Sequence, residues 1–456
     1  MKNGHKLASL GLIAASILAN PAVAQVFVSG NDGKQVRTGD AVPGPFADEA
    51  VTLSVGRSGR PEIIGRVAAP ATLNGPPVSV AVARNGRFAL VTSAQRPGPD
   101  GKLQPWGIVS AIDLRKPAQP KVTGQLELPP GSMGVALLPD GKRALIASAS
   151  DDSVAVVGVQ PDGTLKLLQT IRLEAKSEPR DVVASPDGRT AYVVRFGDAK
   201  LTKLAIDKAE VRRAGEIAVG IQPDGAVISR DGRFLYNSNF GGTPLSGTAG
   251  AVSTVDLARG EMVAATAVGP TPEHVALSPD GKYLAAVIGN GSAFTRTAAN
   301  FAEVTGQLKV FRAGGAELVP IAEAPIGHNC QGAAFTDDNR TILVQCAVEK
   351  TIAAFRFDGK TLTPVDGALD FDGRPEALQN APQLKLIVKS GCPVRLNTKL
   401  SPATTGSIRV SPPDRMMSPG SSPMPNSDSL LASQAVERAG LPSAAAPTPS
   451  AASTPL

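Results

Sequence analysis

The sequence has few of the residues from which common metal and cofactor sites are built. It contains three cysteines, three histidines and one tryptophan. No CxxC, CxxCH or paired Cys/His spacing occurs, which excludes a zinc ribbon and an attached c-type haem. No P-loop, dinucleotide fingerprint or serine nucleophile elbow is found in a suitable context. We therefore expect no cofactor and no metal, and no catalytic residue can be assigned from a motif.

Long apolar runs are absent except at the N-terminus, where the pattern is that of a secretory signal. Lys2 and Lys6 flank the start of an uncharged apolar stretch, residues 7–19, which is too short to span a membrane comfortably. Ala22-Val23-Ala24 is typical of a signal-peptidase site, so residues 1–24 are expected to be removed. The mature protein would be periplasmic or secreted, with no transmembrane segment. The alternative is an uncleaved membrane anchor.

Runs of one charge are also absent. The net charge is +6, and removal of Lys2 and Lys6 with the leader leaves +4. The charges are scattered, so no stripe for a polyanion is expected. One Trp and three Tyr leave few stacking surfaces for single-stranded bases. Nucleic acid is therefore not an expected partner, and binding of nucleic acid or an envelope polymer ranks lowest among the functions considered.

The sequence does contain a repeat, a turn phrase of the type Ser-Pro-Asp-Gly-Lys between two apolar runs. Pro, Asp and Gly suit successive positions of a tight turn, and Asn339 replaces the glycine because Asn tolerates the left-handed conformation. A second hairpin follows most copies, and the glycine positions are 44 to 58 residues apart. This spacing is typical of four-stranded β-propeller blades. The copies lie at 84–87, 138–142, 185–189, 229–233, 278–282 and 336–340.

The ends of the repeat region indicate how the ring closes. Residues 376–378 and 384–389 resemble the first and second strands of a seventh blade, and 51–55 and 62–67 resemble its third and fourth strands. Joining them removes exposed sheet edges. We predict an all-β, seven-bladed propeller over residues 50–392, closed by a blade shared between the two ends. It follows an N-terminal extension, residues 25–49, and precedes a Ser/Pro/Ala-rich disordered tail, residues 393–456.

The three cysteines lie late in the chain. Cys330 and Cys346 are equally distant from Asp338 at the centre of a predicted hairpin turn, which would place them opposite each other. Export to an oxidising compartment favours pairing. We favour a Cys330–Cys346 disulfide with Cys392 free, and a bridge from Cys392 to either partner remains open.

The candidate site is the mouth of the central channel, which the first strand of each blade lines in a propeller. Polar residues at this point could hold a small ligand or a cation, and the alternative is a water-filled channel. His274 and His328 fall beside the ring, and Arg195, Asn237, Asn239 and Asn290 are expected on loops at the same rim. Aligning the repeats gives the ring Ser79, Met133, Arg180, Asp224, Glu273, Gln331 and Glu376. The residues chosen as ligand-binding are Arg180, Asp224, Glu273, His274, His328, Gln331 and Glu376.

Two phrases resemble the YVTN-type propeller repeat family. Residues 236–239, Tyr-Asn-Ser-Asn, are similar to its Tyr-Val-Thr-Asn phrase, and residues 272–282 are similar to its proline, apolar strand and Ser-Pro-Asp-Gly-Lys phrase. The resemblance covers about residues 50–390. The resemblance implies the propeller fold. The superfamily to which these repeats belong includes exported YncE-like propellers, lactonase-like proteins similar to 6-phosphogluconolactonase, and propeller domains of redox enzymes. No catalytic motif of the family is present to carry over.

Two functions lead. The first is an exported binding or scaffold propeller that holds a small molecule or an envelope protein at the mouth or rim, acting as a monomer. The second is a lactone hydrolase acting on a periplasmic or extracellular lactone, in which ring acids and Arg180 position water and polarise a carbonyl.

Overall fold

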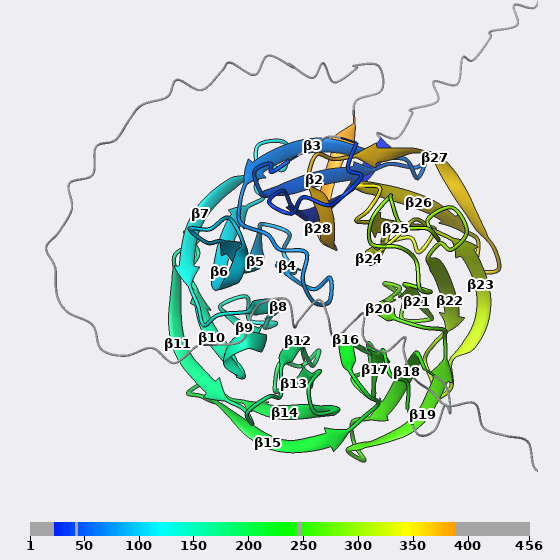
Figure 1. Cartoon of the computed structure of the whole chain (residues 1–456). Helices are drawn as coiled ribbons and strands as arrows, with labels where there is room; N and C mark the ends of the chain where they lie inside the picture. Colours follow the sequence, from blue (N-terminus) through cyan, green and yellow to red (C-terminus); the bar gives the residue numbers. More distant parts are fainter. Residues whose placement is uncertain (1–21, 42–43, 244–248, 389–456) are drawn as a thin grey trace, which may run out of the picture. The chain divides into compact units, whose positions relative to one another are not determined.

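The computed structural model describes residues 22–41, 44–243 and 249–388. The chain divides into two units, Met1–Cys392 and Pro393–Leu456, and all described residues belong to the first. These residues form seven antiparallel sheets of four strands each, arranged as blades around a central axis (Figure 1). The predicted seven-bladed all-β propeller is confirmed. Most of the predicted leader, the tail and Cys392 lie outside the described residues.

The blades are numbered in chain order, and in each blade the first strand lies nearest the axis (Figure 1). The first blade is β4 (Val80–Val82), β5 (Phe88–Pro97), β6 (Leu103–Asp113) and β7 (Lys121–Glu127). The second is β8 (Ser132–Leu137), β9 (Arg143–Ser148), β10 (Ser153–Val159) and β11 (Leu165–Arg172), with a 3-10 turn, η1 (Ala149–Asp151), between β9 and β10. The third is β12 (Pro179–Ala184), β13 (Thr190–Arg195), β14 (Lys200–Ile206) and β15 (Val211–Ala218).

The fourth blade is β16 (Pro223–Ile228), β17 (Phe234–Asn239), β18 (Ala251–Asp256) and β19 (Glu261–Ala267). The fifth is β20 (Pro272–Leu277), β21 (Tyr283–Ile288), β22 (Gln307–Arg312) and β23 (Val319–Pro325). The sixth is β24 (Cys330–Phe335), β25 (Thr341–Cys346), β26 (Thr351–Phe357) and β27 (Leu362–Asp370). The seventh is β28 (Arg374–Val388), β1 (Ala22–Asp32), β2 (Glu49–Val55) and β3 (Pro61–Ala68). No helix among the described residues has the length and apolar character needed to cross a membrane.

The repeated phrase forms the turn between the first and second strands, as its residues predict. In the third blade, Ser185 Oγ donates to Asp187 Oδ1 at 2.6 Å, and the Arg189 N–H donates to the same oxygen at 3.0 Å. Gly188 has φ of +68°, and Asn339 reaches +59° at the equivalent position. The Asp side chain therefore satisfies backbone donors that the tight turn leaves unpaired.

The composition of the seventh blade corrects the strand assignment made from the sequence. Residues 384–388 continue the innermost strand β28, and the second strand is β1, from the segment predicted as an N-terminal extension. β1 pairs with β28 from Ala22↔Val388 to Asp32↔Arg374. A register shift leaves residues 382–384 without direct partners, so the proline at 382, which resembles a turn in the sequence, lies in a bulge.

The core consists of seven apolar clusters, one at each interface between neighbouring blades. The cluster between the sixth and seventh blades, for example, joins Phe27 and Leu53 to Leu343 and Ile352. Each blade thus buries both faces of its sheet against neighbours, and this burial stabilises the ring by about 25 cal/mol per Å² of apolar surface.

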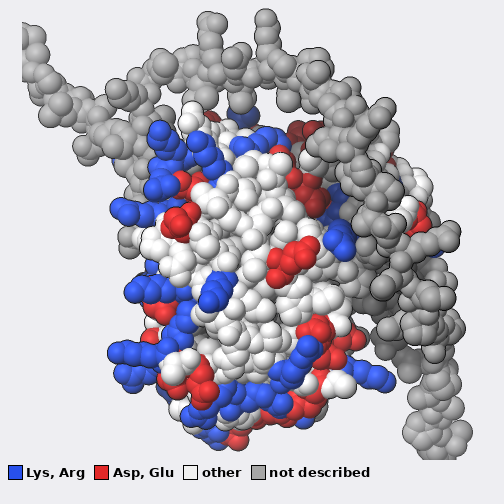
Figure 2. Space-filling model, turned by 90° about the vertical axis from the view of Figure 1, so that its left-hand side faces the viewer, with Lys and Arg blue, Asp and Glu red and all other residues white. Residues whose placement is uncertain are grey.

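The outer surface carries mixed charge. Figure 2 views the ring from the side of β7 and β11, where Lys and Arg mingle with Asp and Glu around a largely uncharged centre. Leu167 and Leu168 of β11 are among the exposed apolar residues, 39% and 52% accessible. On the visible described residues of this face there is no continuous basic stripe.

Shortening the side chain at the buried centre of β1 tests whether this strand closes the ring. Phe27 is fully buried, so Phe27→Ala should lower the free energy of unfolding by about 3–5 kcal/mol. Val36, which follows β1 and is 52% exposed, gives a control, because Val36→Ala should change stability by less than about 0.5 kcal/mol. Urea unfolding of both variants measures the difference. Equal stability of the two would contradict a structural role for β1.

Candidate functional site at the channel mouth

A repeated backbone device fixes the ring residues of the third to sixth blades. In each, the residue two positions before the ring residue has a left-handed backbone, with φ between +44° and +57°. Its carbonyl accepts a hydrogen bond from the residue that follows the second strand, as in Phe196 N–H to Glu178 O at 3.1 Å. Non-glycine residues adopt this conformation at a cost, so the hydrogen bond and the following strand hold it in place. The left-handed residues are Glu178, Gln222, Thr271 and Asn329.

Three ring residues from consecutive blades form one electrostatic cluster. Arg180 Nη1 donates to Asp224 Oδ1 at 3.1 Å, and their side chains are 12% and 1% exposed. Asp224 Oδ2 is buried and has no hydrogen-bond partner among the described residues. Glu273 is half-buried, and its carboxyl interacts with both Asp224 and Arg180. We call Arg180, Asp224 and Glu273 the mouth triad.

Burial shifts both carboxyl groups of the mouth triad toward the neutral form. It raises the pKa of Asp224 to about 6, although the neighbouring Arg180 cation opposes the shift. Burial, and then the negative charge of Asp224, raise the pKa of Glu273 well above its ordinary value. The pair therefore holds a proton to higher pH than two exposed carboxyl groups would, an arrangement suited to acid–base chemistry.

The other ring residues do not join this cluster. Ser79 Oγ donates to Glu376 Oε2 at 2.7 Å, and burial raises the pKa of Glu376 well above its ordinary value. Gln331 Nε2 donates to Asn329 Oδ1 at 3.1 Å. Met133 lies with its sulfur 2.6 Å from where a Cβ on Gly75 would stand. The predicted single ring is therefore divided into separate groups.

The two histidines have structural partners. His274 Nδ1 accepts the N–H of Ala333 from the next blade at 3.1 Å, and burial lowers its pKa to about 4, so it is neutral. His328 Nδ1 is 2.5 Å from Glu349 Oε1, and its ring stacks on Phe301 with centroids 3.9 Å apart. These contacts occupy Nδ1 of His274 and both ring nitrogens of His328, whose Nε2 lies 2.6 Å from Phe301 O.

Three of the four residues expected on rim loops belong to strands. Arg195 ends β13, is fully buried, and forms ion pairs with Glu174, Asp198 and Glu216. Asn237 and Asn239 lie within β17 and hydrogen-bond each other at 2.9 Å. Asn290 does follow β21, but its Nδ2 donates to Thr305 O at 2.9 Å. All four stabilise the blades.

The segment that leads into β4 runs toward the centre of the ring (Figure 1). Pro76 and Pro77 of this segment are buried. A Cβ on Gly225 of the fourth blade would lie 3.7 Å from Pro76 Cβ, and one on Gly332 of the sixth blade would lie 3.4 Å from Pro77 Cβ. We call residues 73–78 the plug. Proline suits it because it has no N–H to satisfy.

Sequence reasoning missed the plug and two aromatic residues. Phe196 directly follows β13, and Arg180 Cζ lies 3.3 Å from the centre of its ring. Phe240 directly follows β17 and packs edge-on against Phe196, with centroids 5.8 Å apart. The signal in the sequence is a phenylalanine at the same repeat position in two consecutive blades.

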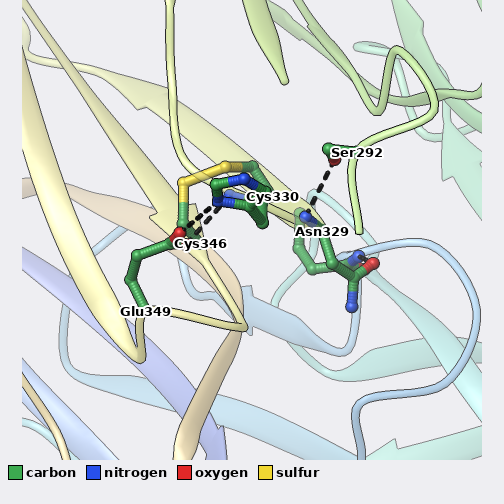
Figure 3. The surroundings of a disulfide bond; sticks show 7 residues. Ser292, Asn329, Cys330, Cys346 and Glu349 are labelled. Atoms are coloured by element: carbon green, nitrogen blue, oxygen red, sulfur yellow. Dashed lines mark hydrogen bonds and ion pairs between the residues drawn. A yellow bond between two sulfur atoms is a disulfide. The ribbon is translucent and has the colours of Figure 1, made fainter. Parts of the chain in front are cut away.

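The disulfide stabilises the mouth in the sixth blade. Cys330 and Cys346 are paired across β24 and β25 and joined by a disulfide with an S–S distance of 2.00 Å (Figure 3). Cys330 directly follows Asn329, whose N–H donates to Ser292 Oγ of the fifth blade at 3.2 Å. The bond therefore covalently fixes the start of a channel-lining strand.

The described residues contain no group of three or more His, Cys, Asp or Glu side chains arranged to hold a metal ion. The mouth triad has two such side chains, Asp224 and Glu273, beside the guanidinium of Arg180.

Comparison with known proteins finds similarity to other seven-bladed β-propellers. Residues 134–316 match the family described as lactonase, 7-bladed beta-propeller, which is under half of the chain. No curated protein has a sequence that matches significantly.

Two solved structures illustrate the similarity. A candidate 6-phosphogluconolactonase from Bacteroides uniformis superposes with a TM-score of 0.60 at 17% identity, covering 78% of this chain and 99% of that one. The periplasmic gluconolactonase PpgL of Pseudomonas aeruginosa gives 0.59 at 18% identity, with coverages of 78% and 99%. At these identities the similarity establishes the fold and leaves the activity open.

The buried Asp181, adjacent to Arg180, allows a test of mouth electrostatics. Its Oδ2 accepts the Ala226 N–H of the next blade at 2.9 Å, and burial raises its pKa to about 7. A raised carboxyl pKa gives stability that is complete below the unfolded pKa, near 4, and lost as the pH rises through about 7. Relative to the native protein, Asp181→Asn should therefore gain stability between pH 5 and 8, by up to about 1.4 kcal/mol per pH unit.

Urea unfolding across this range measures the gain. Asp187→Asn is the control, because the hydrogen bond from Ser185 lowers the pKa of Asp187 and its contribution is lost only at acid pH. A constant difference between Asp181→Asn and the native protein from pH 5 to 8 would contradict the assignment.

Proposed function

We propose that the protein hydrolyses lactones at the mouth triad. The observation that carries this proposal is the meeting of one guanidinium with a buried and a half-buried carboxyl group, both of raised pKa, from three consecutive blades. Opening a lactone requires activation of water, stabilisation of the carbonyl oxygen as it becomes negative, and a proton for the departing ring oxygen. The mouth triad contains one group for each task.

Asp224 suits the role of general base. Its pKa of about 6 leaves it ionised at neutral pH yet basic enough to take a proton from water, and its Oδ2 has no protein partner among the described residues. Arg180 would hold the carbonyl oxygen, since a guanidinium has five donors and the Asp224 bond uses one of them. Glu273, whose pKa is raised well above its ordinary value by burial and by the charge of Asp224, would supply a proton to the ring oxygen as the C–O bond breaks. The product is the hydroxy acid.

The comparisons support this proposal over a scaffold without chemistry. All three members of the mouth triad lie within residues 134–316, the stretch that matches the lactonase family. The two structures cited carry lactonase names, one of them for a periplasmic protein. That this chain also acts outside the cytoplasm, as a monomer, is part of the proposal, and its support is the secretory pattern at the N-terminus.

A second candidate is a binding propeller without catalysis, which the plug favours. Pro76 and Pro77 close the axis, and Ser79, Gln331 and Glu376 are satisfied by protein partners around it. A plugged channel leaves less room for a substrate than an open one. In this case the mouth would hold a ligand or an envelope protein, and no turnover would depend on the mouth triad.

Hydrolysis of a lactone panel by the mature protein, followed as acid release, separates the two functions. Arg180→Ala should lower kcat/KM roughly 100- to 1000-fold, because it removes the oxyanion donor. Glu273→Gln should lower kcat roughly 100-fold or more, because it removes the acid. The rate of the native protein should rise with pH through about 6, as Asp224 ionises.

The matched control is Arg189→Ala, which removes an exposed arginine from the turn at the other end of β12. It should leave kcat/KM unchanged. Turnover that is absent throughout the panel, or that persists in both mouth variants, would reject lactone hydrolysis at this site and favour the binding propeller.

A further inference from the structure

The loops that surround the mouth triad are apolar in the same blades that supply it. Phe196 and Phe240 follow the second strands of the third and fourth blades, and both are half-buried. Ile221 is 56% exposed and lies over Gly241, with its Cγ2 2.6 Å from where a Cβ on that glycine would stand. We call Phe196, Phe240 and Ile221 the apolar wall.

The fold does not require aromatic residues at these positions. The same backbone hydrogen bond that Phe196 and Phe240 donate is donated by Gly289 in the fifth blade and Ala347 in the sixth. A small side chain therefore satisfies the structure equally well. Partly exposed phenylalanines in the two blades that carry Arg180 and Asp224 point to a ligand that covers them.

The apolar wall contacts the guanidinium of the mouth triad through Phe196. The Arg180 guanidinium stacks on Phe196 while it donates to Asp224, so the planar group is held between an aromatic face and a carboxylate. Phe196 in turn packs against Phe240. A carbonyl bound by Arg180 would thus have an apolar surface beside it, which fixes where the rest of the substrate lies.

The charge of the mouth triad argues against an anionic substrate. The positive charge of Arg180 is offset by Asp224, and the electrostatic partners of Glu273 are those same two groups. A phosphate group beside the triad would approach a carboxylate with no cation of the triad left to neutralise it. A neutral substrate avoids this penalty.

We propose, on the basis of the lactonase function above, that the substrates are neutral lactones carrying a flat or bulky apolar group. The apolar group packs on Phe240 and Ile221, and the lactone carbonyl reaches Arg180. Phe240 and Ile221 then determine specificity without taking part in the chemistry. Polyhydroxylated and phosphorylated sugar lactones gain nothing from this wall, because their surfaces are polar.

Three lactones test the proposal with the full-length mature protein: dihydrocoumarin, glucono-δ-lactone and 6-phosphoglucono-δ-lactone. Dihydrocoumarin should have a kcat/KM at least tenfold higher than either sugar lactone. Phe240→Ala should raise KM for dihydrocoumarin roughly tenfold with little change in kcat, because an aromatic contact is lost. KM for glucono-δ-lactone should not change. Trp106→Ala, which removes a partly exposed aromatic from the first blade, is the control and should affect none of the three.

The outcomes separate this inference from the function on which it rests. A preference for either sugar lactone, or an equal effect of Phe240→Ala on all substrates, overturns the inference and leaves lactone hydrolysis standing. If no lactone is hydrolysed, calorimetric binding of 3,4-dihydroquinolin-2-one, the lactam that mimics dihydrocoumarin, decides the question. Binding weakened by Phe240→Ala supports an apolar ligand at the wall, and absence of binding to the native protein overturns it.

Discussion

The pairing of β1 with β28 is the interaction on which the rest of the structure depends. Each blade covers both faces of its sheet with its neighbours, so the seven apolar clusters form a closed circle with no terminal blade. If β1 left β28, the seventh blade would lose its centre, and the clusters on both sides of it would be exposed. Two unpaired strand edges would also appear, which invite aggregation. A small number of backbone hydrogen bonds between the two ends of the chain thus maintains the whole ring.

The closed ring then provides equivalent positions around the mouth, at which the chain varies its residues. A left-handed residue and the strand that follows it present one side chain at the same height in each of four blades. The third to fifth blades use this position for Arg180, Asp224 and Glu273, and the sixth uses it for Gln331, which hydrogen-bonds locally. Because the backbone is set by the fold, the chemistry depends on which side chains occupy neighbouring blades and on how deeply they are buried. The function proposed above therefore uses one arc of the mouth, beside the aromatic residues of the same blades.

Much of the fold follows from short-range patterns. The turn phrase has similar local chemistry in its copies: Asp, or Asn85 in the first copy, accepts backbone donors, and Gly or Asn takes a positive φ. Blade number and hairpin positions could therefore be predicted. The plug could not be predicted, because Pro76 and Pro77 belong to no strand or turn pattern in the sequence. They approach Gly225 and Gly332, which lie in blades far from the plug along the chain. The strand β1 was missed because its first residues overlap the predicted leader. β28 was divided because its bulge contains a proline.

The sequence by itself determined the repeat, the seven blades, the alignment of the mouth residues and the symmetric placement of Cys330 and Cys346, since all of these depend on spacing along the chain. Only the tertiary structure decided which mouth residues act together. Arg180 meets Asp224 because adjacent blades bring them within 3.1 Å, whereas His274 is held by a strand of the next blade and His328 by Glu349 in a turn. Burial then decided the protonation of the acids, because the loss of water around a carboxyl depends on everything packed against it. Spacing in the sequence contains no measure of that burial.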